Sequence, residues 1–383
     1  MKNSLLLITC CLGMWACTRT VDPVNAPTPP TTTTPTVQTK TLLTGYEIIW
    51  GMDFLPNGDL IFGEKRGRMY RRSGETVTEL TGLPTDINTS GQGGLLDIRV
   101  HPNYAANGWI YASYAASAAG TTNTQLNLVR FKLTENRLTD LQTIFRASAT
   151  NQWKGHYGSR IEFDKSGLLY LSIGEGGPST YGGVNSPNKN AQNVQTEWGK
   201  VHRMTDSGAI PADNPILPGN TAPTTVFSYG HRNPQGLITN PLTGDMWESE
   251  HSAKGGDEVN ILKKGSNYGW PLVSYGINYD GTTISASPTM AGVENPIHTW
   301  TPSIGPCGLA FVTSDSLKSW KGNLLVGGLA LNYLSRLELD GNKVVRESKL
   351  LDGNRVRNVK QAPDGSIYVS VENPGRVLRL VLR

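Results

Sequence analysis

Six segments of the chain repeat one pattern, in which an apolar stretch, a polar turn rich in Pro, Asp or Gly, and a second apolar stretch follow each other. The segments begin at Met52, Ile98, Ile161, Leu237, Ala310 and Val359. Many of the stretches alternate apolar and polar residues, which is typical of β-strands, so each segment predicts a β-hairpin. One hairpin cannot bury its own apolar face, and repeated units of this kind therefore stack around a common core.

Six stacked hairpin units predict an all-β fold, a six-bladed β-propeller, because a closed ring leaves only short and protected strand edges. The 43 glycines agree with many tight turns between short strands. Long insertions separate some repeats, notably residues 176–198 and 266–302, and we expect such loops to build a binding face at the top of the ring. An open β-sandwich or two smaller barrels are the alternatives.

The N-terminal residues are expected to lie outside this fold. Residues 1–16 have a short basic start and an apolar stretch, which predicts a signal peptide. A small residue precedes Cys17 and loosely matches a bacterial lipoprotein cleavage site, with ordinary secretion as the alternative. Residues 17–40 are then a lipid anchor and a Pro/Thr-rich linker, and residues 41–383 the propeller. We predict a periplasmic or cell-surface protein that reaches the membrane only through lipid on Cys17.

Charge and cysteine content exclude several classes of function. The net charge is +4 without a long basic run, so nucleic-acid binding is not expected. Cys10 and Cys11 would leave with the signal peptide, so Cys307 would be alone in the mature domain. Cys307 has no basic neighbour in sequence and is predicted to be a small buried residue rather than a reactive thiol. A P-loop, a G-x-S-x-G elbow and a haem-attachment motif are absent from the sequence.

Two polar groups are predicted to meet at one end of the third hairpin. His156 lies between glycines just before this hairpin, and Glu175 follows its second strand. A carboxylate on one ring nitrogen fixes the tautomer and leaves the other nitrogen as a general base. A hydrogen-bonded structural histidine is the alternative for His156 taken alone.

Three further polar clusters are candidate ligand sites. Residues 227–237 combine Arg232, Asn233 and Gln235 with turn residues, a polar set for which a purely structural loop has no need. Arg355 and Arg357 alternate and share one side of an extended segment, which suits a polycarboxylate or phosphate. A solvated strand face paired with acids is the alternative there. Residues 250–258 offer carboxylates and loop carbonyls that suit calcium better than zinc, or else form a structural turn.

These motifs together resemble the soluble quinoprotein sugar dehydrogenases of the glucose/sorbosone dehydrogenase family, above all the aldose sugar dehydrogenase branch. The resemblance extends from Trp50 to about Leu380. Its matching blocks are residues 91–96, the His156 segment, and residues 230–237, 250–258, 267–271 and 354–357. The family implies a six-bladed propeller that binds pyrroloquinoline quinone (PQQ) and calcium at the top of the ring.

The resemblance also implies roles for individual residues. His156 would take the proton from the anomeric hydroxyl of an aldose, and Glu175 would orient it. Gln92 and Arg232 would contact the substrate and the quinone oxygen. The remaining cofactor contacts would come from Asn233, Arg355, Arg357 and the carbonyls of Ser252 and Ala253. Those two carbonyls would bind the catalytic calcium, and a second, structural calcium would be held by Asp257, Glu258 and Tyr268.

The chain departs from the family pattern at three places. Glu175 stands where the glucose dehydrogenase branch has Asp, and Ser252-Ala253 stands in place of Gly-Pro. Ala330 replaces a cofactor-binding lysine of some members, and this loss would weaken quinone binding by about 1–3 kcal/mol. The aromatic pair that stacks on glucose cannot be located, which predicts a shallow site of broad specificity.

The sequence therefore predicts a PQQ- and calcium-dependent oxidation of aldoses at C1 to aldonolactones. Electrons would pass to an external acceptor, a cytochrome or a quinone, because no haem motif is present. A monomer or a homodimer is expected. The alternatives are a calcium-dependent, lactonase-like propeller hydrolase and a non-catalytic propeller that binds glycans or a protein.

Overall fold

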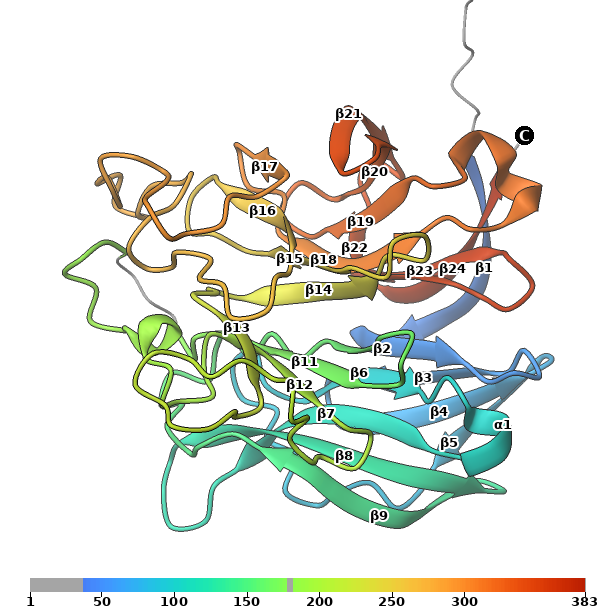
Figure 1. Cartoon of the computed structure of the whole chain (residues 1–383). Coiled ribbons are helices and arrows are strands. Elements are labelled where there is room, and N and C mark those ends of the chain that lie inside the picture. The colour runs from blue at the N-terminus through green and yellow to red at the C-terminus, as the bar shows by residue number, and fades with distance from the viewer. Residues whose placement is uncertain (1–36, 178–181, 383) are drawn as a thin grey trace, which may run out of the picture. The chain divides into compact units, whose positions relative to one another are not determined.

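Six four-stranded antiparallel sheets form the blades of a β-propeller in the computed structural model (Figure 1). In five blades the strands pair in sequence order, from the inside of the ring outward. The sixth blade has the order β22-β23-β24-β1, so its outermost strand comes from the N-terminal side of the domain. The predicted all-β, six-bladed architecture is confirmed.

The two inner strands of the blades, in chain order, are β2 (Ile49–Phe54) and β3 (Leu60–Glu64), β6 (Leu95–Val100) and β7 (Ile110–Ser117), β10 (Ile161–Phe163) and β11 (Leu169–Ile173), β14 (Pro234–Thr239) and β15 (Met246–Glu250), β18 (Pro306–Phe311) and β19 (Leu324–Gly328), and β22 (Arg355–Gln361) and β23 (Ile367–Glu372). The outer strands are β4 (Arg68–Ser73) and β5 (Thr76–Leu80), β8 (Thr124–Thr134) and β9 (Arg137–Arg146), β12 (Lys200–Met204) and β13 (Val226–Tyr229), β16 (Asp257–Ile261) and β17 (His298–Trp300), β20 (Tyr333–Asp340) and β21 (Lys343–Leu350), and β24 (Gly375–Leu382) and β1 (Val37–Tyr46). Each predicted hairpin is the inner strand pair of one blade.

Helical structure is confined to short segments within residues 37–177 and 182–382, the part of the chain that the structure describes. These are α1 (Tyr104–Asn107) and the 3₁₀ turns Asn190–Gln192 and Asp315–Trp320. In those residues no helix has the length and apolar character needed to cross a bilayer. The predicted signal peptide and Cys17 anchor lie outside the described residues, and β1 begins at Val37, ahead of the propeller boundary predicted at residue 41.

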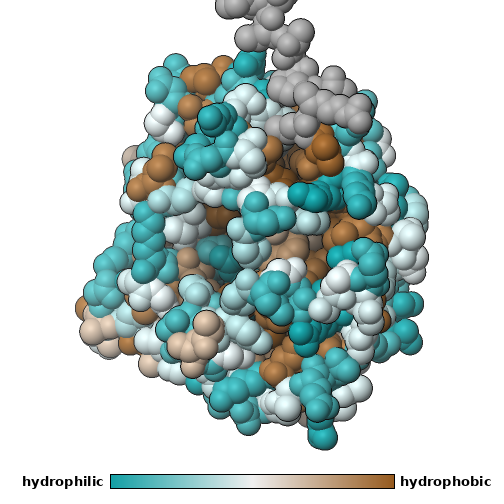
Figure 2. Space-filling model, turned by 90° about the vertical axis from the view of Figure 1, so that its right-hand side faces the viewer, coloured by the Kyte–Doolittle hydropathy of each residue, from teal (hydrophilic) through white to brown (hydrophobic). Residues whose placement is uncertain are grey.

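The hydrophobic core lies mainly between neighbouring blades. One apolar cluster joins β6, β7 and β8 to β10 and β11, and another joins β18 and β19 to the blade that precedes them. Strands β3 and β19 are buried along their whole length. Close approach of the inner strands requires glycine, because a Cβ at Gly51 or Gly236 would overlap the backbone of the next blade. On the face in Figure 2, hydrophobic residues form separate patches among hydrophilic ones.

Candidate active site

A cavity of about 990 Å³ opens among the strand ends and loops of several blades. Loop 262–297, between β16 and β17, contributes Tyr275, Ile277 and Tyr279 to its wall. The predicted site residues that line the cavity are Gln92, His156, Arg232, Asn233, Ser252, Ala253, Asp257, Arg355 and Arg357. The other three, Glu175, Glu258 and Tyr268, do not line it. Residues far apart in the sequence therefore share one cavity.

His156 is held by hydrogen bonds on both its backbone and its ring. Its amide donates to Oε1 of Gln92 (2.9 Å), and its Nδ1 lies 3.0 Å from Oε1 of Glu175. The backbone of His156 has a φ of 45° and approaches Gly174 so closely that a Cβ there would overlap it. The carboxylate at Nδ1 favours the Nδ1–H tautomer, which leaves the Nε2 lone pair to accept a proton.

Burial and charge keep the His156 ring neutral. The ring is buried, and this burial together with the positive charge of Arg232 lowers its pKa, while Glu175 acts in the opposite direction. Glu175 is itself positioned by a second donor, because Nε1 of Trp270 donates to its Oε2 (2.6 Å). Together the three groups hold an uncharged imidazole at the cavity wall.

Arg232 and Asn233 come from the polar turn between β13 and β14. The turn needs Gly230, which has a φ of 83° and lies so close to Tyr268 and Gly269 that a Cβ would overlap them. The amide of Arg232 donates to Oε2 of Glu250 (2.6 Å), and its Nη1 donates to the carbonyls of His251 (3.2 Å) and Ser252. Within the described residues, its buried Nε has no hydrogen-bond partner.

Arg355 and Arg357 lie on one face of β22, as their alternation predicts. Nε of Arg355 lies 2.6 Å from Oε2 of Glu372, and Nε of Arg357 lies 2.6 Å from Oε1 of the same residue, at the end of β23. Burial alone would raise the pKa of Glu372, but the two guanidinium groups hold it below its ordinary value. Two cations thus share one carboxylate, and a formal positive charge remains at this end of the cavity.

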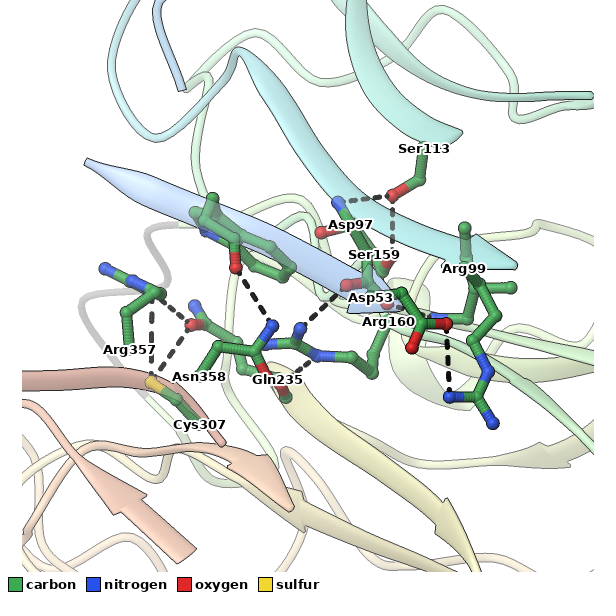
Figure 3. Close-up of polar contacts among 12 residues, drawn as sticks. Asp53, Asp97, Arg99, Ser113, Ser159, Arg160, Gln235, Cys307, Arg357 and Asn358 are labelled. Atoms are coloured by element: carbon green, nitrogen blue, oxygen red, sulfur yellow. Dashed lines mark hydrogen bonds and ion pairs between the residues drawn. The ribbon is translucent and has the colours of Figure 1, made fainter. Parts of the chain in front are cut away.

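A polar network continues below Arg357 (Figure 3). Nη1 of Arg357 donates to Oε1 of Gln235 (2.7 Å), and the same oxygen lies 3.5 Å from Sγ of Cys307. Nε of Arg160 donates to the Gln235 carbonyl (2.9 Å). The Trp50 ring is close to both arginines, because the guanidinium carbons of Arg160 and Arg357 lie 4.3 Å and 5.7 Å from its centroid. Burial raises the pKa of Cys307 to about 11, so this residue is a buried thiol and not a nucleophile.

Of the three residues predicted for a second calcium, Glu258 and Tyr268 line one small pocket, whereas Asp257 lines the large cavity. Asp257 and Glu258 are neighbours on β16, so their side chains point to opposite faces of the sheet. Asp257 lines the large cavity and accepts hydrogen bonds from the amides of Ser252 (2.8 Å) and Gly305 (2.7 Å). Glu258 faces a separate small pocket beside Tyr268. The sequence prediction overlooked this alternation because it did not recognise β16 as a strand.

A buried acidic cluster adjoins that small pocket. Nδ1 of His231 lies 3.3 Å from Oε1 of Glu250 and 3.7 Å from Oε1 of Glu248. Nδ2 of Asn260 donates to both Glu248 (2.8 Å) and Glu258 (3.0 Å). Burial, reinforced by the charge of Glu250, raises the pKa of Glu248 and of Glu258 well above the ordinary range. The sequence prediction gave no role to His231, although it stands in the block 230–237, or to Glu248, which belongs to none of the blocks.

Four further cavity residues were not assigned a role from the sequence. Lys65, Trp50, His251 and Tyr279 all line the cavity. His251 stands inside the matching block 250–258 and Trp50 marks the start of the family resemblance, whereas Lys65 and Tyr279 belong to no block. The pKa of His251 falls to about 3 because of burial and the nearby charges of Arg357 and Arg232, so this ring is also neutral.

Comparison with known proteins agrees with this geometry. Residues 46–379 match the family model described as glucose/sorbosone dehydrogenase. Aldose sugar dehydrogenase YliI of Escherichia coli K12 is 35% identical over 354 residues, which cover 90% of this chain and 93% of that protein.

Solved structures of similar proteins have the same fold. The apo-form crystal structure of the soluble aldose sugar dehydrogenase from Escherichia coli superposes with a TM-score of 0.84 at 33% identity, covering 91% of this chain and 100% of the other. The PQQ-bound aldose sugar dehydrogenase of Streptomyces coelicolor gives a TM-score of 0.74 at 28% identity, covering 91% and 98%. As the sequence motifs predict, the chain belongs to the glucose/sorbosone dehydrogenase family of sugar-oxidising enzymes.

Proposed function

We propose that the protein is a PQQ- and calcium-dependent aldose dehydrogenase, which oxidises the C1 hydroxyl of aldoses and yields aldonolactones. Family membership and the aldose sugar dehydrogenases among its relatives support this assignment. The single observation on which it depends is a neutral, carboxylate-held His156 in the wall of the same cavity as Arg232, Arg355 and Arg357. A base and a cationic cradle then lie within one site.

The cavity suits a flat tricarboxylate such as PQQ. Its volume of about 990 Å³ is ample for a tricyclic cofactor together with a sugar. Five basic and two acidic side chains line it, which gives a formal excess of three positive charges. Arg232, Asn233, Arg355 and Arg357 would hold the cofactor, and planar guanidinium groups pair well with carboxylates. When bound, the quinone would supply the two-electron acceptor.

A catalytic calcium is supported by the carbonyl oxygens around Arg232. The carbonyls of His251 and Ser252 both accept hydrogen bonds from its guanidinium, so they converge on a place that suits a cation. We assign this calcium to the backbone carbonyls of Ser252 and Ala253, because both residues line the cavity and calcium prefers oxygen ligands. For the second, structural calcium we propose Glu258 and Tyr268 as ligands, because both line the small pocket.

The protein residues would act on the sugar as follows. Nε2 of His156 takes the proton from the C1 hydroxyl, and Glu175 holds the ring and stabilises the imidazolium that forms. Gln92 and Arg232 orient the sugar and stabilise developing negative charge beside the base. Tyr279 lines the cavity and is exposed, so its ring can pack against the sugar.

The cellular setting is also a proposal. We infer a periplasmic or cell-surface protein that is anchored through lipid on Cys17, since a signal-like stretch precedes this residue. An external cytochrome or quinone would receive the electrons. The sugar dehydrogenase family is consistent with both points. A monomer or homodimer is proposed.

Calorimetric titration of the apo-protein with PQQ, with and without calcium, tests the assignment. We expect saturable binding that requires calcium, together with dye reduction that depends on both an aldose and PQQ. A calcium-dependent lactonase would instead hydrolyse lactones without any effect of PQQ, and a non-catalytic propeller would do neither. Absence of PQQ binding in the presence of calcium would refute the proposed function.

The variant His156→Gln tests the base. We expect kcat to fall by about 100- to 10,000-fold, the usual contribution of a general base. Binding of PQQ should stay within a few-fold of wild type, because the cationic residues are untouched. Near-normal turnover of His156→Gln would show that another group removes the proton.

A further inference from the structure

Lys65 is a cationic residue of the cavity wall to which the proposed mechanism assigns no role. It directly follows β3 in the first blade and lines the cavity. Its Nζ donates to the carbonyls of Gly91 (3.0 Å) and Thr89 (3.4 Å). Among the described residues no carboxylate forms an ion pair with it, so its charge has only neutral partners.

The surroundings of Lys65 differ from those of the two arginines on β22. Arg355 and Arg357 share Glu372, so a single positive charge remains from that group of three. Partial burial lowers the pKa of Lys65, and Arg357 adds to this effect while Glu47 and Glu372 oppose it. Lys65 therefore belongs to the same electrostatic neighbourhood as the arginine pair but approaches it from the first blade.

Lysine chemistry allows this ammonium group to change partners. A lysine has a flexible stem and three rotatable donors, so the group can exchange a carbonyl for another acceptor. Hydrogen bonds from a cation to an ionised oxygen are roughly twice as strong as neutral ones. An anionic oxygen entering this end of the cavity would therefore compete well with the carbonyls of Thr89 and Gly91.

We propose that Lys65 binds a carboxylate of the anionic cofactor and acts with Arg355 and Arg357 as the third cation of the cradle. This inference rests on the proposed function, since it takes PQQ as the occupant. The alternative is a tether, in which Lys65 only fastens loop 89–92 and thereby positions Gln92.

Titration with PQQ in excess calcium distinguishes the two roles. We expect Lys65→Met to weaken PQQ binding by about 10- to 100-fold, as loss of a charge-assisted hydrogen bond does, and Lys65→Arg to keep most of the affinity. The affinity of wild type should fall more steeply with salt than that of Lys65→Met, because a charge contact is screened. Thermal melts confirm that each variant is folded, and Lys343→Met on β21 is the matched control.

A second-site variant makes the test sharper. Ala330 is exposed, lines the same cavity and follows Leu329, whose carbonyl accepts from Nη1 of Arg355 (2.7 Å). A lysine there would restore charge near the arginine pair without touching loop 89–92. We expect Lys65→Met/Ala330→Lys to regain at least about a third of the lost affinity on a logarithmic scale, as partly independent charge contacts allow.

The outcomes separate the two proposals. If wild type fails to bind PQQ, the proposed function is wrong and the role of Lys65 falls with it. If wild type binds and Lys65→Met binds equally well, only the inference about Lys65 is overturned. A loss in Lys65→Met that neither changes with salt nor responds to Ala330→Lys would identify the tether and likewise overturn it.

Discussion

The ionisation of single residues controls what this cavity can do. His156 is neutral because burial and Arg232 lower its pKa, and Glu175 offsets only part of that effect. A base with a pKa below neutral is fully available at pH 7 but has less driving force for proton transfer. Glu175 therefore has two roles, since it orients the ring and raises the basicity of Nε2.

Glu175→Gln separates these two roles. The carboxylate stabilises the imidazolium, so its removal lowers the pKa of His156 still further, and the acid limb of kcat/KM should move to lower pH. The plateau rate should fall by about 10-fold or more because the base is weaker. Measured pH–rate profiles of wild type, Glu175→Gln and the exposed Glu75→Gln provide the check. An acid limb that stays in place would mean that His156 is not the titrating base.

Sequence reasoning succeeded for residues in local motifs and failed where tertiary structure decides. Arg232 and Asn233 stand in one turn, and Arg355 and Arg357 alternate on one strand, so their proximity could be predicted. Lys65 has no motif, and only the closing of the ring brings it near Arg357.

At the scale of elements, the loop before β12 is hydrogen-bonded to Glu175 and so helps to position His156. Nζ of Lys200 donates to the carbonyls of Asn190 (2.7 Å), Ala191 (3.2 Å) and Trp198 (2.6 Å). Side-chain amides of Asn188 and Asn190 in turn donate to the carbonyl of Glu175 (both 3.1 Å). A buried lysine thus ties a long loop to the residue that orients His156.

Lys200→Met should loosen this loop. Three carbonyls would lose their hydrogen-bond donor in a buried place, which costs about 2–5 kcal/mol of unfolding free energy. We expect a clear drop in the thermal midpoint, measured by circular dichroism, and a reduced kcat through Glu175. Lys343→Met, at an exposed position of β21, should melt like wild type. Equal midpoints for the two variants would rule out a structural role for Lys200.

Inner strands were predictable and outer strands were not, for a physical reason. Inner strands such as β3 are buried on both sides, so their apolar residues give a clear signal. Outer strands such as β21 are largely exposed and carry charged residues that resemble a loop. β16 is mostly buried, but Asp257, Glu258 and Asn260 interrupt its apolar pattern, so the strand was missed together with the opposite orientation of Asp257 and Glu258.

At the scale of the whole propeller, the ring is closed by strands from both ends of the described chain. β1 pairs with β24 from Val37 opposite Leu382 to Tyr46 opposite Gly375, and Figure 1 shows the two strands next to each other. Leu43 of β1 is buried in the apolar cluster between the sixth and first blades. Repetition of hairpins predicted the number of blades, but not which strand completes the last one.

Removal of β1 should therefore open the ring. A chain that starts at Glu47 would expose the edge of β24 and lose the packing of Leu43, whereas a chain that starts at Thr36 keeps both. We expect the shorter chain to melt at a lower temperature and to aggregate, because an unpaired strand edge can form hydrogen bonds with the edge of another molecule. Circular dichroism melts and light scattering measure both effects. Identical melting of the two chains would contradict a stabilising role for β1.

The pairing of β1 with β24 also has a consequence for biosynthesis. β1 is synthesised before the other strands but can pair only when β24 has been made. A product that ends before β24 therefore has an incomplete sixth blade. Such a product does not reach the native fold, and its unpaired strand edge is accessible to proteases. Completion of the sixth blade therefore requires synthesis of the whole chain through β24.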